Sequence, residues 1–173
     1  MVIIRVLLLK KQGIKAMKFG AIDKRDFLIP PFALFYFYLV LANAFNLPTI
    51  NKPEIFHNEI ISWFGVFLCL LGLAFVFYSL ISFKKSFRVG IDVNVKEELI
   101  TTGVFAISRN PMYTSFALVL IGQFFIYPGW ILLVYIIAAI WLFQRQILLE
   151  EDFLRKHYGQ EYLKYCKRVR RYI

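Results

Sequence analysis

Long apolar runs alternate with short polar segments along this chain. A helix needs about 20 apolar residues to cross the hydrocarbon core, and the runs Phe27 to Leu47 and Ile60 to Phe83 are both long enough. A third run, Met112 to Tyr127, would make a helix about 24 Å long, which is marginal for a crossing. A fourth run covers Trp130 to Leu149. The pattern predicts an all-α fold, a polytopic membrane helix bundle with about four transmembrane helices.

Prolines and glycines stand where these helices are expected to begin and end. Pro30 and Pro111 lie in the first turns of the first and third runs, where a missing N–H donor is tolerated. Pro128-Gly129 separates the third run from the fourth, so we expect these two helices to form a hairpin. Beyond the fourth run the helix should continue to Gly159, and a short cytoplasmic helix, Gln160 to Arg170, should follow.

Basic residues lie almost entirely on one side of the predicted bundle. Of 21 Lys and Arg residues, all but Lys52 fall in the N-terminal segment, in the loop 84–111 or in the C-terminal tail. The positive-inside rule then predicts four crossings with both termini in the cytoplasm. We expect residues 1–26 to be a basic interfacial segment with a helix lying on the membrane, the alternative being a frayed basic tail.

Composition supports a membrane protein, because 60% of the 173 residues are hydrophobic and 19 are Phe. A net charge of +10 is also found in nucleic-acid-binding proteins, but here the charges flank apolar runs, so nucleic acid is not expected as a partner. Cys69 lies in an apolar run and Cys166 in the basic tail, which gives no disulfide framework. The His, Cys and Asp residues have no metal-ligand spacing, and no metal is expected.

Two polar segments flank the predicted hairpin and should meet at one membrane face. The first ends in Arg109-Asn110-Pro111, which a solvated loop with a proline helix start would also explain. In the second, Gln146 and Glu150 are four residues apart and share a helix face. Polar groups on the last turns of a membrane helix usually face a cavity, although a snorkelling boundary is the alternative. Acidic residues there also oppose the helix dipole, which points to a function rather than to stability.

A series of short motifs runs through both segments in a fixed order: Leu99-Ile100-Thr101-Thr102-Gly103, Arg109-Asn110-Pro111-Met112-Tyr113, Glu150-Glu151, Tyr158-Gly159 and Tyr162-x-x-Tyr165. In order and spacing, residues 97–170 resemble the isoprenylcysteine carboxyl methyltransferase family, which is related to the phospholipid methyltransferases. The resemblance implies S-adenosyl-L-methionine as the methyl donor. It also implies a lipophilic or lipidated acceptor that enters from the membrane lipids.

The resemblance further implies roles for individual residues. Cofactor contacts would come from both segments: Leu99, Ile100, Phe105, Asn110, Pro111, Met112, Tyr113 and Glu150. The catalytic set would be Glu150, Arg145 and Gln146. The chain 1–173 would then be one domain, with its first two spans in 27–83 and its cofactor-binding catalytic region in 84–173. We expect a prokaryotic plasma membrane as its location.

Two departures from the family pattern leave the acceptor open. Asn110 stands where the family has a histidine, and an amide cannot take up a proton at neutral pH. Gln146 stands where the family has an arginine, while Arg145 lies about 100° away around the helix. Carboxyl O-methylation of an isoprenylcysteine-like substrate is the main reading. The alternatives are a phospholipid amine N-methyltransferase, an NADPH-dependent membrane reductase and a non-catalytic scaffold. Neither the acceptor nor the oligomeric state follows from the sequence.

Overall fold

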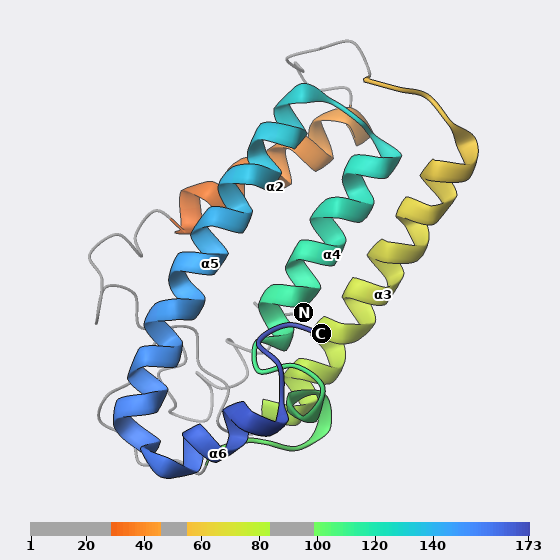
Figure 1. Cartoon of the computed structure of the whole chain (residues 1–173). Coiled ribbons are helices and arrows are strands. Elements are labelled where there is room, and N and C mark those ends of the chain that lie inside the picture. Colours follow the sequence, from red (N-terminus) through yellow and green to blue (C-terminus); the bar gives the residue numbers. More distant parts are fainter. Residues whose placement is uncertain (1–28, 46–54, 84–98) are drawn as a thin grey trace, which may run out of the picture.

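A computed structural model of the chain describes residues 29–45, 55–83 and 99–173, and these residues form helices and loops only (Figure 1). The helices are α2 (Ile29–Ala44), α3 (Glu59–Phe83), α4 (Pro111–Ile126), α5 (Trp130–Tyr158) and α6 (Gln160–Arg168), with a 3-10 turn η3 (Gly103–Ala106). The all-α prediction is therefore confirmed for this part of the chain. The interfacial segment predicted for 1–26 lies outside it.

The helices begin and end close to the prolines and glycines that are expected to bound them. Pro111 occupies the first turn of α4, with Asn110 as the residue that caps it. Gly159 ends α5 at φ 52°, a left-handed conformation that glycine adopts without a steric penalty. The last helix is two residues shorter than predicted, because the backbone of Val169 is already extended.

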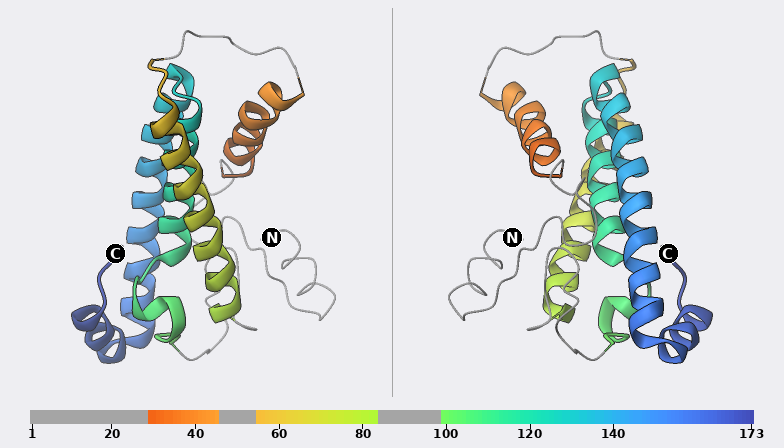
Figure 2. Two further views of the ribbon diagram at one scale, coloured as in Figure 1. Left: turned by 90° about the vertical axis from the view of Figure 1, so that its right-hand side faces the viewer. Right: turned by 90° about the vertical axis from the view of Figure 1, so that its left-hand side faces the viewer.

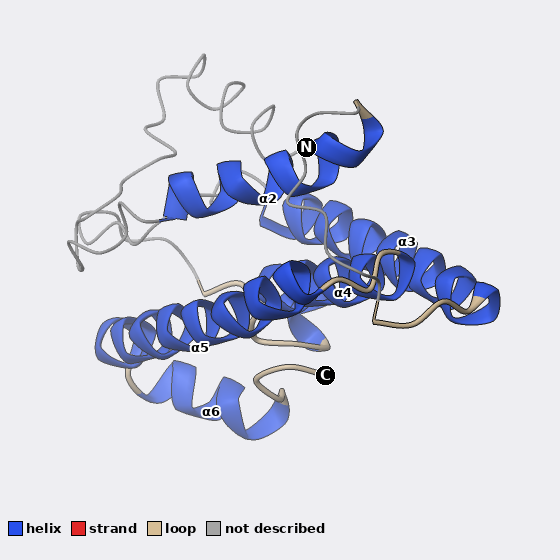
Figure 3. Cartoon of the chain, turned by 90° about the horizontal axis from the view of Figure 1, so that it is seen from above, coloured by secondary structure: helices blue, strands red, loops and turns tan. Residues whose placement is uncertain are grey.

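Helices α3, α4 and α5 lie side by side, and α2 and α6 flank them on opposite sides (Figures 2 and 3). The turn at Pro128-Gly129 joins α4 to α5, so the predicted hairpin is present. From this turn the two helices diverge toward the end where η3 and α6 lie (Figure 1). We call this end, drawn lowest in Figure 1, the lower end of the bundle.

Glycines let α3 and α4 approach closely. A Cβ atom at Gly65 would lie 2.5 Å from the carbonyl oxygen of Gly122, and one at Gly122 would lie 2.6 Å from that of Gly65. About two turns further along α3, a Cβ at Gly72 would lie 2.9 Å from the carbonyl oxygen of Ser115. Small residues at helix crossings bring backbones into van der Waals contact, which is the main attraction between helices in lipid.

Aromatic and polar contacts attach α2 to the hairpin. The rings of Phe32 and Tyr135 stack with centroids 4.2 Å apart. The Tyr135 hydroxyl donates to the carbonyl oxygen of Phe32 at 3.1 Å, and the Tyr36 hydroxyl donates to Oε1 of Gln123 at 2.6 Å. These three polar side chains thus have partners within the protein, as polar groups in an apolar environment require.

The described helices differ in whether they are long enough to cross a membrane. Two of them, α3 and α5, are long and apolar enough to cross a bilayer, whereas α2 and α4 are apolar but shorter. Large apolar side chains on α3 are exposed, including Ile60, Trp63, Phe67 and Leu70. Contact of such a surface with lipid has no free-energy cost, whereas contact with water does.

Candidate active site

The lower end of α4 carries the first half of the candidate site. Ser108 is buried, and its Oγ accepts the backbone N–H of Asn110 at 3.1 Å. This bond fixes the chain just before Pro111 begins the helix. Thr114 closes the first turn, since both its N–H and its Oγ1 donate to the carbonyl oxygen of Asn110 at 3.1 Å. The side chain of Asn110 is therefore presented from a well-bonded helix start.

Glu150 of α5 meets α4 directly. The hydroxyl of Tyr113 donates to Oε1 of Glu150 at 2.6 Å, a short bond typical of a carboxylate acceptor. Gln146, one turn earlier on the same face of α5, donates from Nε2 to the same oxygen at 3.2 Å. Phe143 lies on this face too, and its ring centroid is 5.7 Å from that of Tyr113. The two polar segments predicted to meet are joined here by the Tyr113–Glu150 bond.

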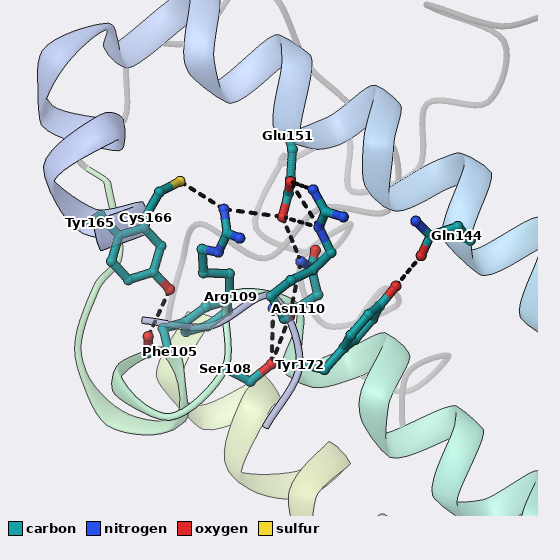
Figure 4. A network of polar contacts seen from close by, with 10 residues as sticks. Phe105, Ser108, Arg109, Asn110, Gln144, Glu151, Tyr165, Cys166 and Tyr172 are labelled. Atoms are coloured by element: carbon teal, nitrogen blue, oxygen red, sulfur yellow. Dashed lines mark hydrogen bonds and ion pairs between the residues drawn. The ribbon is translucent and has the colours of Figure 1, made fainter. Parts of the chain in front are cut away.

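Glu151, the next residue, faces a different set of partners and is 4% exposed (Figure 4). Its Oε1 accepts Nδ2 of Asn110 at 3.2 Å and lies 3.3 Å from Nη1 of Arg109. Arg171 binds both carboxylate oxygens, with Nε 3.1 Å from each and Nη2 2.8 Å from Oε2. We call Glu151, Arg171, Arg109 and Asn110 the Glu151 cluster.

Backbone groups of the C-terminal segment complete the Glu151 cluster. The carbonyl oxygen of Arg171 accepts Nδ2 of Asn110 and Oγ of Ser108, both at 3.3 Å. The carbonyl oxygen of Arg170 accepts the N–H of Arg109 at 3.0 Å. Hydrogen bonding to Glu151 raises the pKa of the Arg171 guanidinium, so that group stays charged. The C-terminal segment is thereby held against the start of α4.

Helix α6 packs its tyrosines against the loop before α4. Tyr162 and Tyr165 of α6 form a buried cluster with Val169, which directly follows the helix, and Leu99 packs against this cluster. The Tyr165 hydroxyl donates to the carbonyl oxygen of Phe105 at 2.7 Å (Figure 4). Burial raises the pKa of Tyr165 to about 12 and, together with the nearby Glu151 carboxylate, raises that of Tyr162 as well. Both phenols are neutral at physiological pH.

The structure brings together four of the ten residues proposed for the site. Glu150, Gln146 and Tyr113 form one hydrogen-bonded group, and Asn110 lies next to it in the Glu151 cluster. Leu99 instead contacts the tyrosines of α6, and Phe105 is buried in η3. Of the remaining predicted residues, Pro111 is buried whereas Ile100, Met112 and Arg145 are half-buried.

Sequence reasoning missed Arg171, which it had treated only as one charge in a basic tail. Nothing in the local sequence separates Arg171 from its neighbours Arg168 and Arg170, which are exposed. The sequence carried a signal at Glu151, the acidic partner of Arg171. Adjacent acids on a helix point about 100° apart, so Glu150 and Glu151 needed two different environments.

More than half of the chain matches a known protein family. The sequence model of the phospholipid methyltransferase family matches residues 60–161, from the start of α3 into α6. This chain belongs to the phospholipid methyltransferase family. The match includes Asn110, Tyr113, Gln146 and both glutamates, so the candidate site lies inside the part that defines the family.

Within the phospholipid methyltransferase family, the curated relatives are isoprenylcysteine methyltransferases, which confirms the resemblance found in the sequence. The "probable protein-S-isoprenylcysteine O-methyltransferase" of Oryza sativa subsp. indica is 25% identical over 166 residues, covering 94% of this chain and 76% of the relative. Protein-S-isoprenylcysteine O-methyltransferase B of Arabidopsis thaliana is 30% identical over 112 residues, covering 63% of this chain and 57% of the relative. These relatives are plant proteins, and they give no support to a prokaryotic membrane.

A solved structure has a fold similar to that of this chain. The eukaryotic intramembrane Ras methyltransferase ICMT, solved without a monobody, aligns with a TM-score of 0.64 at 18% identity. The alignment covers 95% of this chain and 58% of that chain. It shows a shared fold.

Proposed function

We propose that this protein is an integral membrane methyltransferase that uses S-adenosyl-L-methionine and acts on a lipophilic acceptor. The observation that carries the proposal is the Tyr113–Glu150 hydrogen bond of 2.6 Å within the family-defining region. It joins the start of α4 to the lower part of α5, at the end of the bundle where polar loop and apolar helices meet. A donor from the cytosol and an acceptor from the bilayer could both reach such a place.

The residues present fit the proposed methyl donor. Its ammonium group suits the Glu150 carboxylate, and its sulfonium suits an aromatic face such as that of Tyr113 or Phe143, an attraction of about 0.5–2 kcal/mol. When bound, S-adenosyl-L-methionine supplies a methyl group activated by the positive sulfur. Leu99, Ile100, Phe105, Pro111 and Met112 are proposed as further contacts from the loop and the first turn of α4.

For a carboxylate acceptor, the protein has no proton to remove. A carboxylate is already ionised at pH 7, so no side chain would be needed as a base. The work left to the side chains is to bind, orient and exclude water. Glu150, Gln146 and Tyr113 are proposed to hold the donor, and Arg145 to face the acceptor carboxylate. An isoprenylcysteine-like carboxylate is the main proposal, since it matches the relatives' names.

Phospholipid amine N-methylation is the second candidate. It is favoured because Gln146, at the place of the family's arginine, brings no positive charge for an acceptor carboxylate and donates to Glu150 instead. An amine acceptor must lose a proton, and Glu151 is too deeply held by Arg171 and Arg109 to accept it. Glu150 would then be the base. The two chemistries give different products, because methyl esters are cleaved by base and methylamines are not.

We also propose four crossings with both termini in the cytoplasm, so that the lower end faces the cytosol. The distribution of Lys and Arg supports this topology. Residues 84–173 would be the catalytic region within one domain.

Calorimetry on detergent-purified protein tests the class of activity. S-adenosylhomocysteine and NADPH would be titrated in parallel into the wild-type protein and into Glu150→Gln. We expect saturable binding of S-adenosylhomocysteine only, and a loss of at least 100-fold in affinity in the variant, since a charge-assisted contact to the ammonium is removed.

Other results would contradict the proposal in distinct ways. Binding of NADPH instead would assign the chain to reductases of similar architecture. Binding of neither ligand by folded protein would favour a scaffold. Normal affinity in Glu150→Gln would show that the donor is held elsewhere.

A further inference from the structure

We propose that Arg171 and Glu151 are positioning residues for the methyl-donor site, acting through Asn110 and Glu150. The inference rests on the function proposed above. It gives a role to a C-terminal arginine that lies outside the family match at 60–161. Neither residue is proposed to touch the donor.

Burial rules out direct contact by Glu151. Its side chain is 5% exposed, and both of its oxygens are bound by Arg171. A carboxylate saturated in this way cannot also receive the ammonium of a ligand. Its neighbour Glu150 is half-buried and meets Tyr113 instead. The two acids therefore have separate tasks.

Glu151 sets the rotation of α5 about its axis. Successive residues of a helix are about 100° apart, so fixing the direction of Glu151 also fixes that of Glu150. Arg171 fixes Glu151 through a bidentate contact, Nε and Nη2 against two oxygens, which defines the plane of the carboxylate as well as its position. A lysine would supply a charge without this planar geometry.

The same arginine orients Asn110. Nδ2 of Asn110 donates to Oε1 of Glu151 at 3.2 Å and to the carbonyl oxygen of Arg171 at 3.3 Å. Because an amide is planar, these two bonds also fix the direction of its oxygen. Asn110 precedes Pro111 by one residue and Tyr113 by three. Its position is therefore tied to that of Tyr113, which binds Glu150. Arg171 thus controls both sides of the site from outside it.

The geometry of Arg109 shows that the cluster is arranged around Glu151 rather than around Arg109. Nε of Arg109 is buried without a hydrogen-bond partner among the described residues. Such groups cost stability. Removing Arg171 would leave Glu151 with partners on Oε1 only, Nδ2 of Asn110 at 3.2 Å and Nη1 of Arg109 at 3.3 Å. The carboxylate would then turn, and Glu150 and Asn110 with it.

The test compares Arg171→Gln, Arg171→Lys and the control Arg170→Gln by calorimetry with S-adenosylhomocysteine. Arg170 is the adjacent residue of the same segment, and its side chain is exposed. Titrations would be run at 10 °C, far below the thermal unfolding midpoint measured for each variant, so that all protein is folded. A role in stability alone lowers that midpoint and leaves the affinity of folded protein unchanged.

We expect Arg171→Gln to weaken binding roughly 10- to 100-fold, by analogy with the loss caused by removing partners that orient metal-binding side chains. Arg171→Lys should recover part of that loss, and Arg170→Gln should bind as the wild type does. Equal affinity in wild type and in folded Arg171→Gln would overturn the inference while leaving the proposed function intact. Equal loss in Arg170→Gln would also overturn it, by showing an effect of net charge. Absence of binding by the wild type would overturn both.

Discussion

Helix α4 contacts two neighbours in different ways, α3 along its length and α5 at the lower end. Against α3, Gly65 and Gly122 bring backbones so close that no side chain separates them. Against α5, the contacts are made by long polar side chains, Tyr113 to Glu150 and Asn110 to Glu151. Backbone contact leaves no room for adjustment, whereas side chains can change partners. One face of α4 is built as a fixed support, and the other as a place where a ligand can be received.

The largest effect is expected at the polar face from Glu151→Ala. The change leaves Arg109 buried without its carboxylate, and breaking a buried pair in this way costs about 3–5 kcal/mol of unfolding free energy. Thermal and denaturant unfolding in detergent would measure it. Asp152→Ala is the matched control, because Asp152 pairs with Lys156 on an exposed surface, where a pair is worth about 0–1 kcal/mol. Equal losses in the two variants would contradict the comparison.

At the fixed face, Gly122→Ala should cost about 1–3 kcal/mol of stability through overpacking. The added Cβ would lie 2.6 Å from a backbone oxygen of α3, which cannot move aside alone. S-adenosylhomocysteine affinity of the folded protein should stay the same. Gly129→Ala serves as control, since a Cβ there meets nothing within 4 Å. If Gly122→Ala lost affinity and kept its stability, the two faces of α4 would not be separable.

Tyr113→Phe sharpens the comparison from the ligand side. It removes the hydroxyl that donates to Glu150 and keeps the ring beside Phe143. We expect about a tenfold weaker affinity for S-adenosylhomocysteine, or about 1.4 kcal/mol, and little change in thermal stability. Tyr127→Phe, at the other end of α4, should bind normally. An unchanged affinity in Tyr113→Phe would mean that Glu150 is oriented without the tyrosine.

The smallest effect concerns α6 and depends on pH. Tyr165→Phe removes the hydrogen bond to the Phe105 carbonyl and should cost about 1 kcal/mol at pH 7. Burial raises the pKa of Tyr165 to about 12, against about 10 in an unfolded chain. Its neutral form is thus favoured by folding, so this stability is full below pH 10 and falls as pH rises toward 12.

Unfolding curves at pH 7, 10 and 11.5 would measure that dependence. The alkaline loss of stability should be smaller in Tyr165→Phe than in the wild type. Tyr172→Phe provides the control, because the Tyr172 hydroxyl is exposed and donates to Gln144. A loss that is equally steep in all three proteins would assign the alkaline sensitivity to another group.

Local chemistry predicted the helices well and their partners less well. Pro111 and Gly159 mark helix ends for reasons contained in single residues, a missing N–H and a tolerated positive φ. That α3 packs on α4 through Gly65, Gly72 and Gly122 depends on which faces meet, which no single run specifies. The role of Arg171 is harder still, since it depends on a contact with a residue 20 positions earlier.

The bond between Tyr36 and Gln123 has a consequence for how the protein is made. The two residues are 87 positions apart, and Phe32 and Tyr135 are 103 apart. At about 5–20 residues per second, a ribosome needs roughly 4–20 s to complete the partners of α2. If α2 crosses the membrane as proposed, its Tyr36 hydroxyl has no Gln123 to bind during that interval, and α2 depends on the insertion machinery until α4 arrives.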